Sequence, residues 1–168
     1  MKTTRRLTLA ALLTALALAL SYAERFIPFS LLVPLPGVKP GFANVVTLYA
    51  LCAIDVPMAW TVLTARVLLG SLFAGNASAL LYSAAGGVLA LLTMTLTARA
   101  DRFSLFGISI AGAAAHNIGQ ILAARLVLGS SAVFGYLPLL LISSLVSGAL
   151  TGLLSTLLFR AVDAARAA

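Results

Sequence analysis

Residues 134–159 read FGYLPLLLISSLVSGALTGLLSTLLF and contain no charged side chain. An α-helix rises about 1.5 Å per residue, so ~20 apolar residues cross the hydrocarbon core of a bilayer, which is about 30 Å thick. The length and composition of this stretch therefore predict a membrane-spanning helix, which we place at Phe134–Ala161.

Comparable apolar stretches recur along the whole chain. Hydrophobic residues make up 62% of the 168 residues and charged residues only 9%. A soluble domain carries about a quarter charged residues, which cover its core, so this composition excludes a soluble globular protein. We predict an all-α integral membrane protein of the cell membrane, with residues 1–168 forming a single transmembrane domain. Its six expected spans are Leu7–Ala23, Gly41–Asp55, Pro57–Phe73, Ala77–Ala98, Gly107–Leu128 and Phe134–Ala161.

The first span has an alternative interpretation. Its basic start, its apolar run and the small residues Ser21 and Ala23 are also typical of a cleaved signal peptide. The run is long for a signal peptide, and its removal would leave five spans with a poor charge balance. We therefore expect a retained helix.

The basic residues predict the orientation of the chain. Its net charge is +7, and lysine and arginine collect in the cytoplasmic loops of membrane proteins, so this charge indicates topology rather than nucleic-acid binding. One side of the six-span arrangement collects Lys2, Arg5, Arg6, Arg99, Arg102, Arg160 and Arg166. The other side collects Arg25 and Lys39, with Arg125 near its border. Both termini are therefore predicted to be cytoplasmic, and the segment Glu24–Pro40, which holds four prolines, is predicted to be an outward-facing covering loop.

The fifth span carries three polar side chains on one face. His116, Asn117 and Gln120 fall within roughly 100° of the helical circumference, in a span otherwise made of small and aliphatic residues. Polar groups inside a membrane are costly and usually face the interior of the bundle. Two interpretations stay open: the three side chains bind a ligand, or they form hydrogen bonds between helices.

Two cations indicate an anion-binding region in the outer half. Lys39 and Asn44 flank the start of the second span, where Pro40 precedes unpaired backbone N–H groups that favour anions. Arg66 falls near the middle of the third span, where an unpaired guanidinium costs at least ~2.5–3.5 kcal/mol. Glu24 is the one acidic residue expected on the outward side, so it is a candidate partner for Arg66; a bound anionic ligand is the alternative.

Small residues four positions apart allow helix backbones to approach closely in a membrane. Two such stripes occur: Ala11, Ala15 and Ala19 in the first span, and Ser144, Gly148 and Gly152 in the last. Each stripe is compatible with packing inside the bundle or with docking to another membrane protein.

The rare residue types exclude several kinds of site. Cys52 is the one cysteine and His116 the one histidine, so no metal site is expected. The chain lacks the GxxxxGK(S/T) motif that cradles nucleotide phosphates, and no cofactor is expected. Asp55, Asp101 and Asp163 are far apart in the sequence, so they form no Asp-rich cluster of the kind that holds Mg²⁺ on a prenyl diphosphate.

Four segments together resemble a known membrane family. They are LPGVKPGFANVVTLYAL at 35–51, RVLLGSLFAG at 66–75, SAAGGVLALL at 83–92 and GAAAHNIGQILAARLVLG at 112–129. They resemble the Gx transporters, a family that is also labelled heptaprenyl diphosphate synthase component I. The family is similar in size and six-helix layout to the substrate-capture (S) components of energy-coupling factor transporters.

The resemblance implies a function and a set of site residues. It implies an S-component-like bundle that takes up a small organic molecule, vitamin-like or isoprenoid-related; the net positive charge expected on the outward half separately favours an anionic group. It also implies a separate transmembrane coupling subunit with ATPases, docked at Ala11, Ala15 and Ala19. The substrate-binding residues that it suggests are Lys39, Asn44, His116, Asn117 and Gln120, and Arg66 joins them on the burial argument. The alternative is a non-catalytic membrane accessory subunit of heptaprenyl diphosphate synthesis.

Overall fold

The computed structural model describes residues 2–26, 39–75, 77–100 and 102–167. The described residues form helices and no strands, so the predicted all-α class is confirmed. The α-helices are α1 (Lys2–Ala23), α2 (Asn44–Ala53), α3 (Val56–Ala74), α4 (Ala77–Arg99), α5 (Leu105–Leu128) and α6 (Leu137–Ala167). Two short 3₁₀ helices are η1 (Glu24–Phe26) and η3 (Ser131–Tyr136).

Five of these helices are long and apolar enough to cross a membrane, namely all except α2. The expected second span, Gly41–Asp55, is not confirmed, because α2 has only ten residues and extends over about 15 Å, half the thickness of a bilayer core. Gly41 precedes α2 with a φ of 84°, outside the helical region. Asp55 then caps α3 by accepting a hydrogen bond from the Met58 N–H, so a new helix begins at Val56, with only two residues between α2 and α3.

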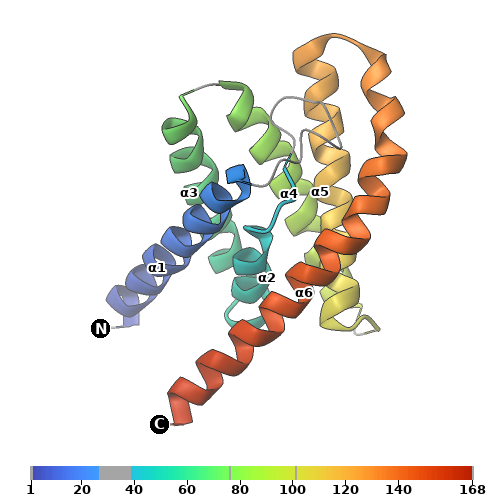
Figure 1. The fold of residues 1–168 in the computed structure, drawn as a ribbon. Helices are drawn as coiled ribbons and strands as arrows, with labels where there is room; N and C mark the ends of the chain where they lie inside the picture. The colour runs from blue at the N-terminus through green and yellow to red at the C-terminus, as the bar shows by residue number, and fades with distance from the viewer. Residues whose placement is uncertain (1, 27–38, 76, 101, 168) are drawn as a thin grey trace.

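The helices run alternately up and down the bundle, and both termini lie at the same end (Figure 1). Helix α2 contacts α1, α3, α4 and α6, and its residues Asn44–Ala50 are all buried. The short helix is therefore enclosed by the longer ones. Its N-terminus lies inside the protein.

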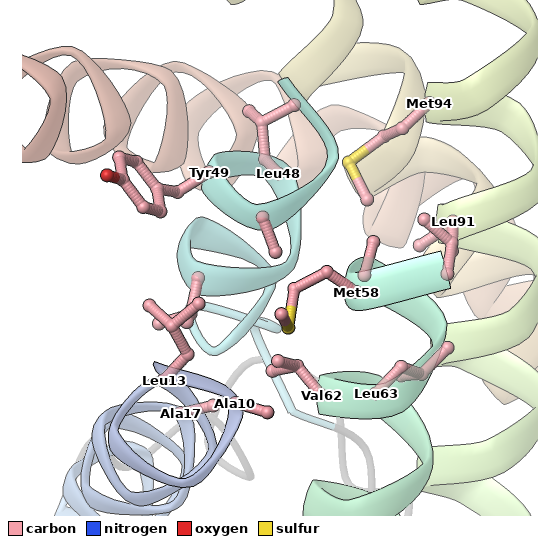
Figure 2. Close-up of a cluster of buried hydrophobic side chains, with 14 of the residues drawn as sticks. Ala10, Leu13, Ala17, Leu48, Tyr49, Met58, Val62, Leu63, Leu91 and Met94 are labelled. Carbon is pink, nitrogen blue, oxygen red and sulfur yellow. The ribbon is translucent and has the colours of Figure 1, made fainter. Parts of the chain in front are cut away.

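One hydrophobic cluster joins α2 to α1, α3 and α4 (Figure 2). Leu48 of α2 belongs to this cluster together with Leu13 of α1 and Met94 of α4, whereas the ring of Tyr49 packs against Phe159 of α6, with 4.9 Å between the ring centroids. Burying a large aliphatic or aromatic side chain contributes about 1.5–3 kcal/mol, so this cluster fixes where α2 begins relative to its neighbours.

Small residues set the spacing of the C-terminal helices. A Cβ atom on Gly119 of α5 would lie 2.4 Å from the Ala85 carbonyl oxygen of α4, and one on Gly148 of α6 would lie 2.6 Å from the Ile110 Cα of α5. Ser144, Gly148 and Gly152 are all buried, so this stripe packs within the bundle. In contrast, Ala11, Ala15 and Ala19 are exposed on the outer face of α1.

Candidate functional site

The candidate site is built around the N-terminus of α2. Its N-cap residue, Ala43, offers no side-chain cap, and the N–H groups of the next three residues donate to backbone carbonyls of the preceding turn. The carboxylate of Glu24, which is only 4% exposed, accepts a hydrogen bond of 3.1 Å from the Ala43 N–H. A side chain of η1, directly after α1, thus caps a helix that begins 20 residues later.

Arg66 of α3 lies beside this helix start. It is 6% exposed, and its Nη2 donates to the Asn44 Oδ1 over 3.3 Å. Its Nε has no hydrogen-bond partner in the described part of the chain. Arg66 and Glu24 do not form the direct ion pair that the sequence suggested. Among the described residues, the salt bridge that does form joins Arg6 to Asp55, at the start of α3. The Arg66 Nε–H therefore remains a donor that a further acceptor could bond.

The imidazole of His116 lies between the start of α2 and the middle of α4. A Cβ atom on Gly41 would lie 2.9 Å from the His116 Cδ2, and one on Gly86 would lie 2.7 Å from its Cε1 and Nδ1. Such contacts are closer than van der Waals distance, so both glycines are needed to leave room for the ring. Gly41 also has the positive φ that glycine adopts without strain.

Gln120, one turn along α5 from His116, contacts the main chain of Lys39. In the orientation of the Gln120 amide in which every neighbouring polar group forms a hydrogen bond, its nitrogen donates to the Lys39 carbonyl over 3.2 Å. Its oxygen then accepts from the Lys39 N–H at 3.2 Å and from the His116 Nε2 at 3.1 Å. The polar face of α5 therefore holds the chain that leads into α2.

Asn117 points elsewhere. Its Nδ2 donates to the Leu140 carbonyl over 2.7 Å, which joins α5 to α6. For Asn117, then, the expected hydrogen bond between helices is present, and it uses the side-chain donor. Of the three polar residues predicted to act together, His116 and Gln120 lie at the α2 start, and Asn117 packs against α6.

A cavity of about 50 Å³ lies next to this polar cluster. Lys39 and Arg66 supply its cationic lining and Ser21 and Ser83 supply hydroxyl groups; Leu18, Tyr22, Val67, Gly70, Phe73 and Ala79 complete it. A space of this size holds water, whereas pockets for organic ligands measure about 300–1,000 Å³. The lining residues from α1 and α4 were not predicted. Nothing in the sequence distinguishes a small or apolar side chain that lines a cavity from one that packs between helices.

The charges around the cavity are unbalanced. Burial raises the pKa of the Glu24 carboxyl above its ordinary value, although the Ala43 and Phe42 N–H groups and the positive charges of Arg66 and Lys39 act in the opposite direction. One carboxylate thus faces two cations.

Two other predictions can be placed in the structure. The outward loop expected at Glu24–Pro40 is described only at its ends, since 27–38 lie outside the described residues. Within the described ranges, no three His, Cys, Asp or Glu side chains come together as a metal site would require.

The family model described as heptaprenyl diphosphate synthase component I matches residues 13–158. The chain belongs to this family. The match confirms the resemblance noted from the four sequence segments, and it covers every residue of the cluster at α2. No curated protein and no solved structure shows a significant match to the chain.

Proposed function

We propose that this protein is the substrate-binding component of a membrane uptake system for a small organic molecule that carries an anionic or acceptor-rich group. The observation that carries the proposal is the convergence of Lys39, Asn44, Arg66, His116 and Gln120 at the buried N-terminus of α2. These residues come from α2, α3, α5 and the segment before α2, so the tertiary fold brings them together.

The energetics of the cluster support a ligand rather than helix packing alone. A buried guanidinium inside a membrane protein costs at least ~2.5–3.5 kcal/mol unless it is compensated. Arg66 Nε and His116 Nδ1 have no partners among the described residues, although buried polar groups are nearly always hydrogen-bonded. A bound acceptor would satisfy Arg66, and N-termini of interrupted helices serve anionic groups of substrates in other transporters.

Uptake by this chain requires a conformational change. The present cavity of about 50 Å³ is smaller than an organic molecule, so α1, α3 and α4 must separate where they line it. We propose that a separate ATP-driven coupling complex supplies the energy. The exposed stripe of Ala11, Ala15 and Ala19 supports a docking role for α1, because small residues let a partner helix approach closely.

A second candidate function follows from the family name. The name describes component I of a synthase, which favours a membrane accessory subunit that assembles with a second, catalytic component. A non-catalytic role is compatible with the position of Asp55, at the opposite end of the bundle from the α2 start. Its carboxylate caps α3 and pairs with Arg6. Under this proposal the chain holds an isoprenoid or its precursor and performs no prenyl transfer.

Native mass spectrometry of the purified protein distinguishes the two candidates. Uptake predicts a retained small molecule that is lost in Arg66→Gln and retained in the control Arg99→Gln, whose residue is exposed. The accessory function predicts co-purification with a soluble prenyl synthase. An absence of bound molecule in the wild type and unchanged stability of Arg66→Gln would contradict the uptake proposal.

A further inference from the structure

The anion that occupies the N-terminus of α2 belongs to the protein itself. Glu24 reaches this position from η1, directly after α1, and accepts the Ala43 N–H. The Asn44, Val45 and Val46 N–H groups donate to backbone carbonyls, so the Ala43 N–H is the group that an incoming oxyanion would take over from Glu24. Glu24 thus stands where an anionic ligand would bind.

We propose that Glu24 is an internal competitor for an oxyanion site, and that a carboxylate or phosphate group of the substrate takes its place at the Ala43 N–H beside Arg66. This inference rests on the proposed function and deepens it, because it names the chemical class of the substrate and the residue that its anionic group displaces.

Arg66 is the second, independent observation that points to a ligand. The side chain is more than nine-tenths buried, its Nη2 is held by Asn44, and its Nε has no partner among the described residues. Arg66 lines the cavity together with Lys39. Arg66 therefore connects the two: it bonds Asn44, the first residue of α2, and it also lines the cavity, from which an oxyanion would bring the missing acceptor.

The balance of charge explains why exchange is feasible. Glu24 carries at most one negative charge, against the two positive charges of Arg66 and Lys39, both of which act on it through space. An incoming oxyanion that takes the Ala43 N–H gains the same two cations and carries the burial cost that Glu24 carries now, so one buried anion replaces another. Exchange leaves the helix N-terminus capped throughout.

The first test compares the wild type with Glu24→Gln in detergent, with inorganic phosphate and acetate as probes at constant ionic strength. Glutamine keeps the size of the side chain and removes the competing charge. We expect phosphate, acetate or both to raise the unfolding midpoint of Glu24→Gln with an apparent affinity at least about tenfold tighter than for the wild type, since a hydrogen bond to a charged group typically contributes a factor of this size or more. The preferred probe identifies the group.

The controls separate this site from nonspecific anion effects. The double variant Glu24→Gln with Arg66→Gln should lose the response. Asp55→Asn also removes a carboxylate that caps a helix, but there the cap is open to water, so no tenfold gain is expected. Glu24→Asp keeps the charge and shortens its reach to Ala43, so its affinity for the probes should fall between those of the wild type and Glu24→Gln, even if Glu24→Gln folds poorly.

Equal responses of the wild type, Glu24→Gln and Glu24→Asp to both probes would overturn the proposal. A response that persists after Arg66→Gln would overturn it as well, because the anion would then bind elsewhere. If native mass spectrometry still finds an organic molecule that depends on Arg66, the uptake function stands and only the exchange with Glu24 fails. Phosphate binding by Glu24→Gln without any retained molecule would support the oxyanion site and count against uptake.

Discussion

Replacement of Gly86 by alanine should displace the His116 ring and destabilise the protein. The added Cβ would lie 2.7 Å from two ring atoms and 3.1 Å from the His116 carbonyl oxygen. Since ordinary contacts begin at 3.4 Å, the ring must move by about 0.7 Å. Overpacking of this kind costs about 1–3 kcal/mol, and the ring would also lose its contact with Gln120.

A matched glycine removes the effect of helix propensity from the comparison. Alanine is favoured over glycine by about 0.8–1 kcal/mol inside a helix, and this gain applies equally to Gly70→Ala in α3. There, among the residues that the structure describes, the new Cβ would meet only Leu18 Cδ2, at the ordinary distance of 3.6 Å. We therefore expect Gly86→Ala to be less stable than Gly70→Ala by about 1–3 kcal/mol.

Thermal unfolding in detergent measures this difference, with fluorescence of Trp60, the one tryptophan, as the probe. For a chain of this size, 1 kcal/mol corresponds to roughly 2–4 °C, so the two midpoints should differ by ~2–12 °C. In a His116→Ala background the cost of Gly86→Ala should shrink by at least ~1 kcal/mol, because only the backbone contact remains. Equal midpoints for the two glycine variants, or fully additive effects with His116→Ala, would refute the described position of the ring.

Four further predictions follow from other parts of the structure. Asp55→Ala removes the cap of α3 and should cost about 0.5–2 kcal/mol by thermal unfolding; a smaller loss would contradict the capping role. Asn117→Leu removes the bond from α5 to α6 and should cost ~0.6–2 kcal/mol while ligand retention in native mass spectrometry is unchanged. Ala15→Leu, on the exposed face of α1, should change stability by no more than ~0.5 kcal/mol yet abolish co-purification with a coupling subunit; retained co-purification would exclude this face. Because burial raises the pKa of Glu24, the unfolded state releases its proton first, so stability should fall as pH rises from 4.5 to that raised pKa and then level off. Glu24→Gln should lack this decline in a series of unfolding midpoints against pH.

Several site residues were predictable because their chemistry is rare in an apolar sequence. Arg66 stands out as a cation within a span, and His116 and Gln120 as polar groups on one helical face. The sequence could not separate Asn117 from them, because one helical face can contact two neighbours. In the structure that face meets the start of α2 through His116 and Gln120 and the α6 backbone through Asn117.

Other features had no signal in the sequence. Residues 41–55 are apolar enough to suggest a span, but the break at Gly41 and the cap at Asp55 leave a helix of ten residues. Gly86 is one of 13 glycines, and only its packing against His116 distinguishes it. Ala15 and Gly148 both belong to stripes of small residues, yet the first is exposed and the second buried.

The sequence by itself determined that this chain is an all-helical protein rich in spanning helices, because apolar length and the scarcity of charge are local properties that a bilayer requires. It also marked Arg66 and the polar face of α5 as exceptional. Only the tertiary structure decided that Glu24 caps α2 and that Arg66, Asn44, His116 and Gln120 gather at that helix start. The contacts of Glu24 with Ala43, of Arg66 with Asn44 and of Gln120 with Lys39 join residues 19 or more positions apart, and their formation depends on how the short helix packs between the long ones.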